Sequence, residues 1–182
     1  MRKVIVSEFI TLDGVIESPH LWSLDYWRDE IGAFKDQELF ACDALLLGRV
    51  TYQGFAAAWP QRSDDDGYAD RINNMPKHVV STTLSALTWQ NSALIDSNVV
   101  QAVQQLKAGD GQDLLVFGSG TLIQTLIRHK LVDRYHLLVY PLVVGEGQRL
   151  FEHGDTIPLE LVENRRFDSG VVLLVYETQR NP

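Results

Sequence analysis

The sequence predicts an α/β protein with a largely parallel sheet and an antiparallel C-terminal part. Two observations lead to this class. Short apolar segments alternate with stretches of helical periodicity as far as residue 130. From residue 134 onward, apolar segments follow one another with no helical stretch between them. Because the 182 residues contain no linker, repeat or low-complexity run, we expect one domain over 1–182.

In the first half of the chain, apolar segments predict strands and periodic segments predict helices. The predicted strands cover residues 2–10, 44–47 and 77–81, and the predicted helices cover 29–41 and 49–57. The acidic stretch 63–71 (SDDDGYADR) is expected to be a surface excursion between them.

In the second half, Ser97 is expected to cap a helix whose apolar residues share one face. These apolar residues are Val99, Val100, Val103 and Leu106. A strand at 113–117 and a helix at 121–130 follow. Three strands then end the chain, RYHLLVYPLVV, LELVENRRF and VVLLVYET. The last three supply the antiparallel part of the predicted sheet.

Composition and charge exclude several functions. The net charge of −8 and the pI near 5.0 argue against a broad surface for nucleic acid or anionic membrane. Acid interrupts residues 1–8 too early for a signal peptide, and no apolar window is long enough to span a membrane. The lone Cys42 allows no internal disulfide and is expected to be buried packing. We therefore expect a cytoplasmic protein with no nucleic-acid or membrane partner.

Two apolar strands end in glycine immediately before a helix. Residues 45–55 (LLLGRVTYQGF) turn at Gly48, and residues 113–127 (DLLVFGSGTLIQTLI) turn at Gly118 and Gly120. The first turn of a helix offers unpaired N–H groups and the positive end of the helix dipole, both of which suit a phosphate. A tight strand-to-helix turn that binds nothing is locally an equal alternative.

A third strand, in KHVVSTTLS (77–85), ends in Ser81, Thr82 and Thr83. A carboxylate at such a strand end would bind a ribose 2′-hydroxyl and repel a 2′-phosphate, whereas hydroxyls and amides accept the phosphate. Such clusters also occur as plain polar turns. The recurrence of anion-ready chemistry at three strand ends favours a binding site.

Other motifs do not match. Ile123 stands where the dinucleotide fingerprint G-x-G-x-x-G needs its third glycine, and neither turn has the lysine of a P-loop. Phe117 precedes Gly118, so Ser119 is misplaced for a nucleophile elbow. The histidines show no metal-binding spacing, and we expect no metal.

These three segments, in this order, resemble the cofactor-binding segments of the dihydrofolate reductase superfamily. The N-terminal SEFITLDGVIE and the later LVDRYHLLVYPLVVGEGQRLF are similar to the reductase domain of riboflavin biosynthesis. The resemblance covers essentially the whole chain. It implies a dihydrofolate reductase-like three-layer α/β/α fold, with NADPH lying across the C-terminal edge of the sheet.

The resemblance also implies which residues hold NADPH. The first phosphate-binding turn matches Gly48, Arg49 and Thr51. The segment around the adenosine 2′-phosphate matches Ser81, Thr82 and Thr83. The glycine turn under the pyrophosphate matches Gly118, Ser119, Gly120, Thr121 and Leu122.

On the substrate side, Asp13 and Gly14 match a loop that closes over the nicotinamide in such reductases. Asp13 is a candidate to orient substrate or relay a proton, and equally a candidate loop cap. Trp22 and Trp27 are candidates to stack on a flat heterocycle, with packing or a subunit contact as the alternative. Folate-reducing members place a carboxylate on the first long helix, where this chain has Asp29, Glu30, Asp36 and Glu38. We interpret the first two as helix-start charges and the others as a solvated face.

The function that follows is an NADPH-dependent reductase of a small heterocycle, ribosylaminopyrimidine-like as in riboflavin biosynthesis, or pteridine-like. A true dihydrofolate reductase is the alternative enzyme, and a nucleotide-binding module without catalysis is the alternative of another class. The apolar C-terminal strands and the habit of the riboflavin-type family imply a homodimer, although the same strands are compatible with an ordinary core.

Overall fold

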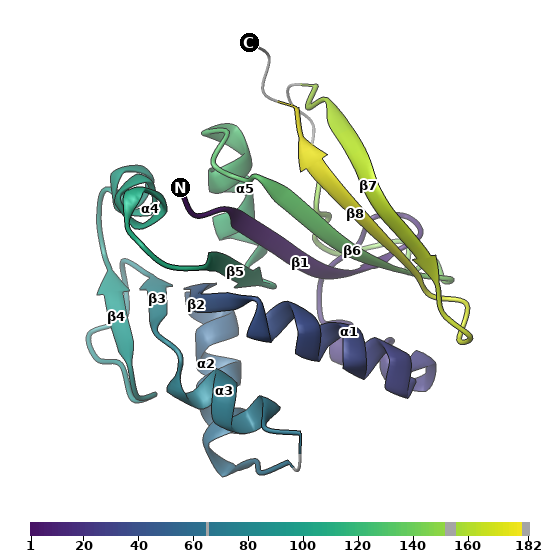
Figure 1. The fold of residues 1–182 in the computed structure, drawn as a ribbon, viewed down its shortest axis with the longest axis horizontal. Helices are drawn as coiled ribbons and strands as arrows, with labels where there is room; N and C mark the ends of the chain where they lie inside the picture. The colour runs from purple at the N-terminus through teal and green to yellow at the C-terminus, as the bar shows by residue number, and fades with distance from the viewer. Residues whose placement is uncertain (65, 152–155, 180–182) are drawn as a thin grey trace.

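The computed structural model describes residues 1–64, 66–151 and 156–179. One mixed sheet of eight strands forms its centre, in the order β4-β3-β2-β5-β1-β6-β8-β7 (Figure 1). The strands are β1 (Val4–Thr11), β2 (Cys42–Gly48), β3 (Lys77–Val80), β4 (Ser92–Ile95), β5 (Asp113–Phe117), β6 (Arg134–Tyr140), β7 (Leu159–Arg166) and β8 (Val172–Thr178). The helices are α1 (Asp29–Phe40), α2 (Arg49–Ala58), α3 (Tyr68–Asn74), α4 (Val99–Ala108) and α5 (Gly120–Arg128).

The strand directions confirm the predicted sheet. The strands from β4 to β6 run parallel, whereas β8 is antiparallel to both of its neighbours, β6 and β7. The central strand β1 is buried along almost its whole length, as expected of a strand with parallel partners on both edges and helices on both faces. Its β-branched and apolar residues suit this environment.

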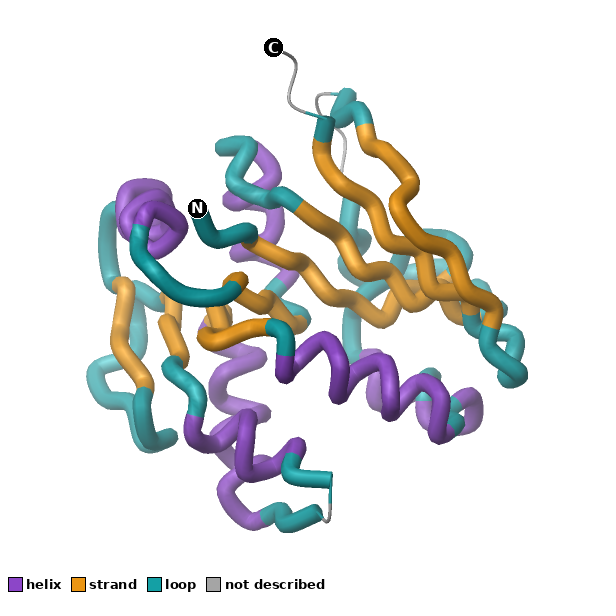
Figure 2. Tube along the Cα trace, viewed as in Figure 1, coloured by secondary structure: helices purple, strands orange, loops and turns teal. Residues whose placement is uncertain are grey.

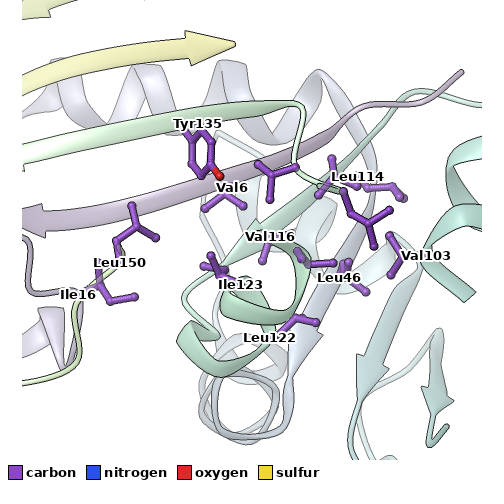
Figure 3. Close-up of a cluster of buried hydrophobic side chains, with 14 of the residues drawn as sticks. Val6, Ile16, Leu46, Val103, Leu114, Val116, Leu122, Ile123, Tyr135 and Leu150 are labelled. Carbon is purple, nitrogen blue, oxygen red and sulfur yellow. The ribbon is translucent and has the colours of Figure 1, made fainter. Parts of the chain in front are cut away.

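Helices cover both faces of the sheet and make the three layers that the resemblance implied (Figures 1 and 2). On one face, α4 and α5 bury Val103 and Ile123 against Val6, Leu46 and Val116 of the sheet (Figure 3). On the other face, α1, α2 and α3 pack their own apolar residues, including Ile31 and Tyr52. Within the described ranges, no helix is both long and apolar enough to cross a membrane.

Three local predictions were wrong. Asn98, in a left-handed conformation, occupies the N-cap position of α4, and its side chain makes no capping hydrogen bond. The Ser97 hydroxyl donates to the Asp96 carboxylate instead of accepting from the helix. The stretch 63–71 is more than a surface excursion, because α3 begins at Tyr68 and buries its apolar side against the sheet. Strand β4 was missed because its four residues are partly exposed and show no strand-like alternation.

The strand order determines where a site can form. Strands β3, β2, β5 and β1 are successive neighbours, and parallel strands end at the same edge of a sheet. The register adds a second feature, because β1 pairs with β5 only as far as Ser7 and Phe117, while it pairs with β6 as far as Thr11. The last part of β1 therefore has no strand beside it on the β5 side.

Candidate functional site

A cleft of about 1740 Å³ follows this edge of the sheet. It brings the three strand-end turns together, as the sequence predicted. The expected cofactor residues that line it are Gly48, Arg49, Thr51, Ser81, Thr82, Thr83, Gly118, Ser119, Gly120, Thr121 and Leu122. Residues from β1, from α1 and from the loop that follows β1 line the same cleft.

A single side chain joins the two glycine turns. Ser119 has a left-handed backbone, with φ of 68°, and its Oγ accepts a hydrogen bond of 2.8 Å from the Gly48 N–H. The same hydroxyl donates to the Phe117 carbonyl at 3.0 Å. The Ser119 hydroxyl is therefore engaged in holding the ends of β2 and β5 together, whereas the sequence analysis placed it directly at a phosphate.

Neighbouring side chains pack against the two glycines of the second turn so closely that neither position can hold a side chain. Gly118 has φ of +49°, and a Cβ built on it would lie 2.9 Å from Thr51 Oγ1. A Cβ on Gly120 would collide with the side chain of Gln148. These two positions therefore require glycine for close packing of the turn against Thr51 and Gln148. Both α2 and α5 begin at residues that line the cleft, so the unpaired N–H groups of their first turns lie at its wall. These features fit a pyrophosphate.

In the third turn, one hydroxyl group stabilises the backbone and the other two face the cleft. Ser81 is buried, and its Oγ accepts hydrogen bonds from the N–H groups of Thr83 and Leu84 at 3.1 Å and 3.0 Å. Thr82 and Thr83 are exposed and line the cleft. Ser81 therefore shapes the turn, and the two threonines are the groups that present polar atoms to a ligand.

Glu8 is a site residue that the sequence analysis missed. It is 3% exposed on β1 and lines the cleft, and its Oε1 is buried without a hydrogen-bond partner among the described residues. Burial raises the pKa of Glu8 well above its usual range, against the opposing charge of Lys35. The only signal in the sequence was a polar pair, Ser7-Glu8, inside an otherwise apolar strand.

On the opposite face of β1, a buried charge network links α1 to the sheet. Glu38 Oε2 accepts hydrogen bonds from Lys35 and, at 2.9 Å, from Ser7, while Glu38 Oε1 lies 2.6 Å from His136 Nδ1. Lys35 Nζ also donates to Ser7 Oγ at 2.7 Å and lies 4.3 Å from the centroid of the Phe117 ring. Glu38 was assigned to a solvated face, which is wrong, because it is 4% exposed.

The network satisfies charges that burial would otherwise make costly. Burial opposes the ionisation of Glu38, but the charges and hydrogen bonds of Lys35 and His136 outweigh it, and the pKa of Glu38 lies below its usual value. Removing one partner of such a buried pair costs roughly 3–5 kcal/mol. The network therefore fixes Lys35 and Ser7 at the wall of the cleft, where both residues lie.

The two candidate tryptophans have different positions. Trp27 lines the cleft, is 42% exposed and has its ring centroid 6.3 Å from that of Phe9. Trp22 does not line the cleft, because its ring packs edge-on against Tyr140 at 5.3 Å and its Nε1 donates to the Glu17 carbonyl. The packing alternative describes Trp22, and only Trp27 is placed to meet a ligand.

Asp13 also lies outside the lining of the cleft. Its carboxylate accepts hydrogen bonds from Thr11 Oγ1 at 2.6 Å, from the Gly145 N–H at 2.9 Å and from the Val144 N–H at 3.3 Å. The Thr11 hydrogen bond lowers the pKa of Asp13 most, and despite the opposing effect of burial the two backbone bonds help to bring it to about 2. This geometry favours the loop-cap interpretation of Asp13 over the catalytic one.

The fold and the cleft define an α/β protein of the dihydrofolate reductase-like class. The chain belongs to the RibD C-terminal domain family, whose model matches residues 2–173. The resemblance noted in the sequence is thereby confirmed over nearly the whole chain.

Relatives and solved structures agree with this assignment. The YyaP protein of Bacillus subtilis (strain 168) is 33% identical over 180 residues, which are 96% of this chain and 94% of that protein. A structure from Shewanella sp. PV-4 attributed to riboflavin biosynthesis superposes with a TM-score of 0.74 at 19% identity, covering 98% of this chain and 99% of that one. The diaminohydroxyphosphoribosylaminopyrimidine deaminase/5-amino-6-(5-phosphoribosylamino)uracil reductase of Thermotoga maritima gives 0.65 at 17% identity, covering 98% of this chain and 57% of that one. At these identities the two solved structures show the fold.

The hydrogen bonds that the Asp13 carboxylate accepts give a testable prediction. Asp13→Asn replaces one acceptor oxygen with an N–H₂ group that faces a donor, so we expect a lower melting temperature at neutral pH. Because the pKa of Asp13 is lowered, its contribution is present above the ordinary value near 4 and is lost as the pH falls towards about 2. Thermal melts of both proteins between pH 7 and pH 2 should therefore converge at the acid end.

Asp110→Asn, at an exposed carboxylate in the turn after α4, is the matched control and should melt like the wild type. If Asp13→Asn melts like the wild type at every pH but loses turnover in a working assay, the carboxylate acts on substrate and the loop-cap interpretation is wrong.

Proposed function

We propose that this chain is an NADPH-dependent reductase of a small heterocyclic substrate. The observation that carries the proposal is that every residue expected from the family resemblance to hold NADPH lines one cleft. On the two sides of β1, the same cleft contains the buried carboxyl of Glu8, whose Oε1 has no hydrogen-bond partner in the described part of the chain, and Lys35, which is held in place by Ser7. Membership of the RibD C-terminal domain family supports a reductase of the riboflavin-biosynthesis type.

Each strand end would bind a different part of the cofactor. The exposed Thr82 and Thr83 after β3 would hold the adenosine 2′-phosphate, and the starts of α2 and α5 would hold the pyrophosphate. Arg49 is exposed beside these starts and would add a charge-assisted hydrogen bond. When bound, the cofactor supplies a hydride, and the protein contributes orientation and electrostatics.

The substrate would lie on the α1 side of β1. There the cleft is lined by the aromatic rings of Phe9 and Trp27, which suit a flat ring, and by Lys35, which the Ser7 and Glu38 contacts hold in place. We propose a ribosylaminopyrimidine-like or pteridine-like heterocycle. The alternatives remain a true dihydrofolate reductase and a nucleotide-binding module that acts through partners.

Oxidation of NADPH by the purified protein tests this proposal. The reduced nicotinamide is followed by its absorbance, with dihydrofolate, with the phosphorylated ribosylaminopyrimidine of riboflavin biosynthesis and with a panel of oxidised pteridines. We expect turnover with at least one flat heterocycle. Turnover with dihydrofolate alone would support the folate alternative, and tight NADPH binding without turnover on the whole panel would support the module.

Cofactor choice gives a second prediction. We expect NADPH to bind more tightly than NADH, because Thr82 and Thr83 offer donors to a 2′-phosphate and no carboxylate stands in this turn to repel it. Arg49→Ala should weaken NADPH binding by about ten- to a hundredfold, since loss of a hydrogen bond to a charged group costs roughly 1.5–3 kcal/mol. Titration by intrinsic tryptophan fluorescence measures both.

Arg128→Ala removes an exposed arginine at the end of α5 that does not line the cleft, and should leave NADPH affinity unchanged. Equal affinities for NADPH and NADH would contradict the 2′-phosphate assignment at the β3 turn.

We also propose that the protein forms a homodimer through the C-terminal strands. The inward residues of β6 and β8, such as Leu138 and Leu173, are ordinary core, but the edge strand β7 exposes Leu161 (47%) and Val162 (52%). An edge strand with apolar side chains and unpaired backbone groups is a surface that natural proteins usually cover. A second copy of the chain would cover it.

Light scattering at micromolar concentration should report a dimer, and Leu161→Lys should convert it to a monomer. Leu24→Lys, at a leucine that is 68% exposed in the loop before α1, is the matched control and should remain dimeric. A wild-type monomer would remove the proposal.

A further inference from the structure

The order of the strands matches the order of chemical groups along NADPH. The proposed 2′-phosphate site lies at the end of β3, and the proposed pyrophosphate site lies at the ends of β2 and β5. Continuing in the same direction, the next strand is β1. A cofactor extended along this edge therefore brings its nicotinamide to β1.

At that point β1 presents Glu8. Pairing between β1 and β5 ends at Ser7, so the segment from Glu8 onward borders the cleft without a strand between. Side chains alternate along a strand, and Val4, Val6 and Ile10 all face the α5 layer, which places Glu8 on that face as well. Ser7 faces the α1 layer and is bonded to Lys35 there. The side chains of Ser7 and Glu8 therefore point to opposite faces of the sheet.

One oxygen of the Glu8 carboxyl has no hydrogen-bond partner among the residues that the structure describes. Oε1 is buried and makes no hydrogen bond among the described residues, whereas the Lys35 ammonium, on the other face, is occupied by Ser7 and Glu38. Lys35 and Glu38 of α1 act on Glu8 through their charges, with opposite signs. Glu17, from the loop after β1, also lines the cleft, and its Oε2 accepts the Gln148 N–H at 2.9 Å. In the described part of the chain, the other carboxylates of the lining are Asp29, Asp36, Asp64 and Asp66. Ile16 and Leu122, which belong to the same apolar cluster as Val6 and Ile10, also line the cleft.

We propose that the carboxyl group of Glu8 pairs with the carboxamide of the nicotinamide in NADPH. A neutral carboxyl has one O–H donor and one carbonyl acceptor, and a carboxamide has one carbonyl acceptor and an N–H₂ donor. The two groups form two complementary hydrogen bonds. An ionised carboxylate would keep the bond from N–H₂ and oppose the carbonyl oxygen. The inference rests on the proposed function, because it assigns a residue to a subsite of the same cofactor.

Ligand analogues test the pairing without any enzymatic assay. In the 3-acetylpyridine analogue of NADPH a methyl group replaces the N–H₂ group, so one of the two hydrogen bonds is lost. The wild-type protein should bind NADPH at least tenfold more tightly than this analogue in a fluorescence titration. Glu8→Met, which removes both hydrogen-bonding groups, should bind the two ligands with affinities that agree within about twofold. Melting temperatures of both proteins verify that the variant is folded.

The pH dependence provides a second readout. Because burial raises the pKa of Glu8, its proton is present at low pH and is lost as the pH rises through that raised value. NADPH affinity of the wild type should therefore fall with rising pH across this range. Glu8→Gln carries an amide that cannot ionise, so its NADPH affinity should lack this fall and follow only the titration of the 2′-phosphate of the ligand, whose second pKa is about 6. Asp110→Asn, at the exposed carboxylate in the turn after α4 and outside the cleft, should behave like the wild type in both experiments.

Two failures are distinguishable. If NADPH binds tightly but Glu8→Met discriminates against the analogue as strongly as the wild type does, the assignment of Glu8 is wrong and the proposed function stands. If the wild type binds no NADPH at any pH, the proposed function is wrong and the assignment of Glu8 is wrong with it.

Discussion

The burial of β1 on both edges and both faces is the constraint on which this structure depends. A strand in that position can carry apolar residues at no cost, but each polar side chain on it needs a partner from the protein or from a ligand. Ser7 is the last residue of β1 that pairs with β5, and Glu8 is the first residue beyond this pairing. The α1 helix supplies partners for Ser7, and no described residue supplies one for Glu8 Oε1. We infer from this missing hydrogen bond that a ligand binds next to Glu8.

The α1 helix provides hydrogen-bond partners for the buried Ser7, and for this reason its buried side is not uniformly apolar. Its buried side combines Ile31, Phe34 and Leu39 with Lys35 and Glu38, so a pair of opposite charges is packed beside a hydrophobic core. His136 from β6 also contacts Glu38 and so connects α1 to β6, the neighbour of β1 on the edge opposite to β5. The position of α1 along the sheet is therefore specified by hydrogen bonds as well as by packing. This arrangement keeps the lysine from moving away from the cleft.

Much of the architecture could be predicted because it depends on local chemistry. An apolar run that ends in glycine before a helical pattern is readable at Gly48 and at Gly118, and the three turns were correctly expected to converge. The cap of α4 was assigned to Ser97 because both Ser97 and Asn98 are good capping residues, and only the backbone conformation of Asn98 decides between them. Glu38 was assigned to solvent because α1 has a weak apolar stripe, from which the buried side cannot be read. The burial of Glu8 depends on where β5 ends relative to β1, and that register is a long-range property.

The loop that follows β1 is tied to residues 144–150, which follow β6, by more than the Asp13 carboxylate. Backbone hydrogen bonds join Ile16 to Gln148 and Leu150 to Gly14, and the Arg149 guanidinium donates to the Asp13 carbonyl. Two loops that are far apart in the sequence therefore form one cross-braced wall beside the cleft. A wall that is already ordered loses little conformational freedom when a ligand binds, so more of the contact energy remains as affinity. The same bracing should make the amide protons of these loops exchange slowly with solvent, which is unusual for segments without regular secondary structure.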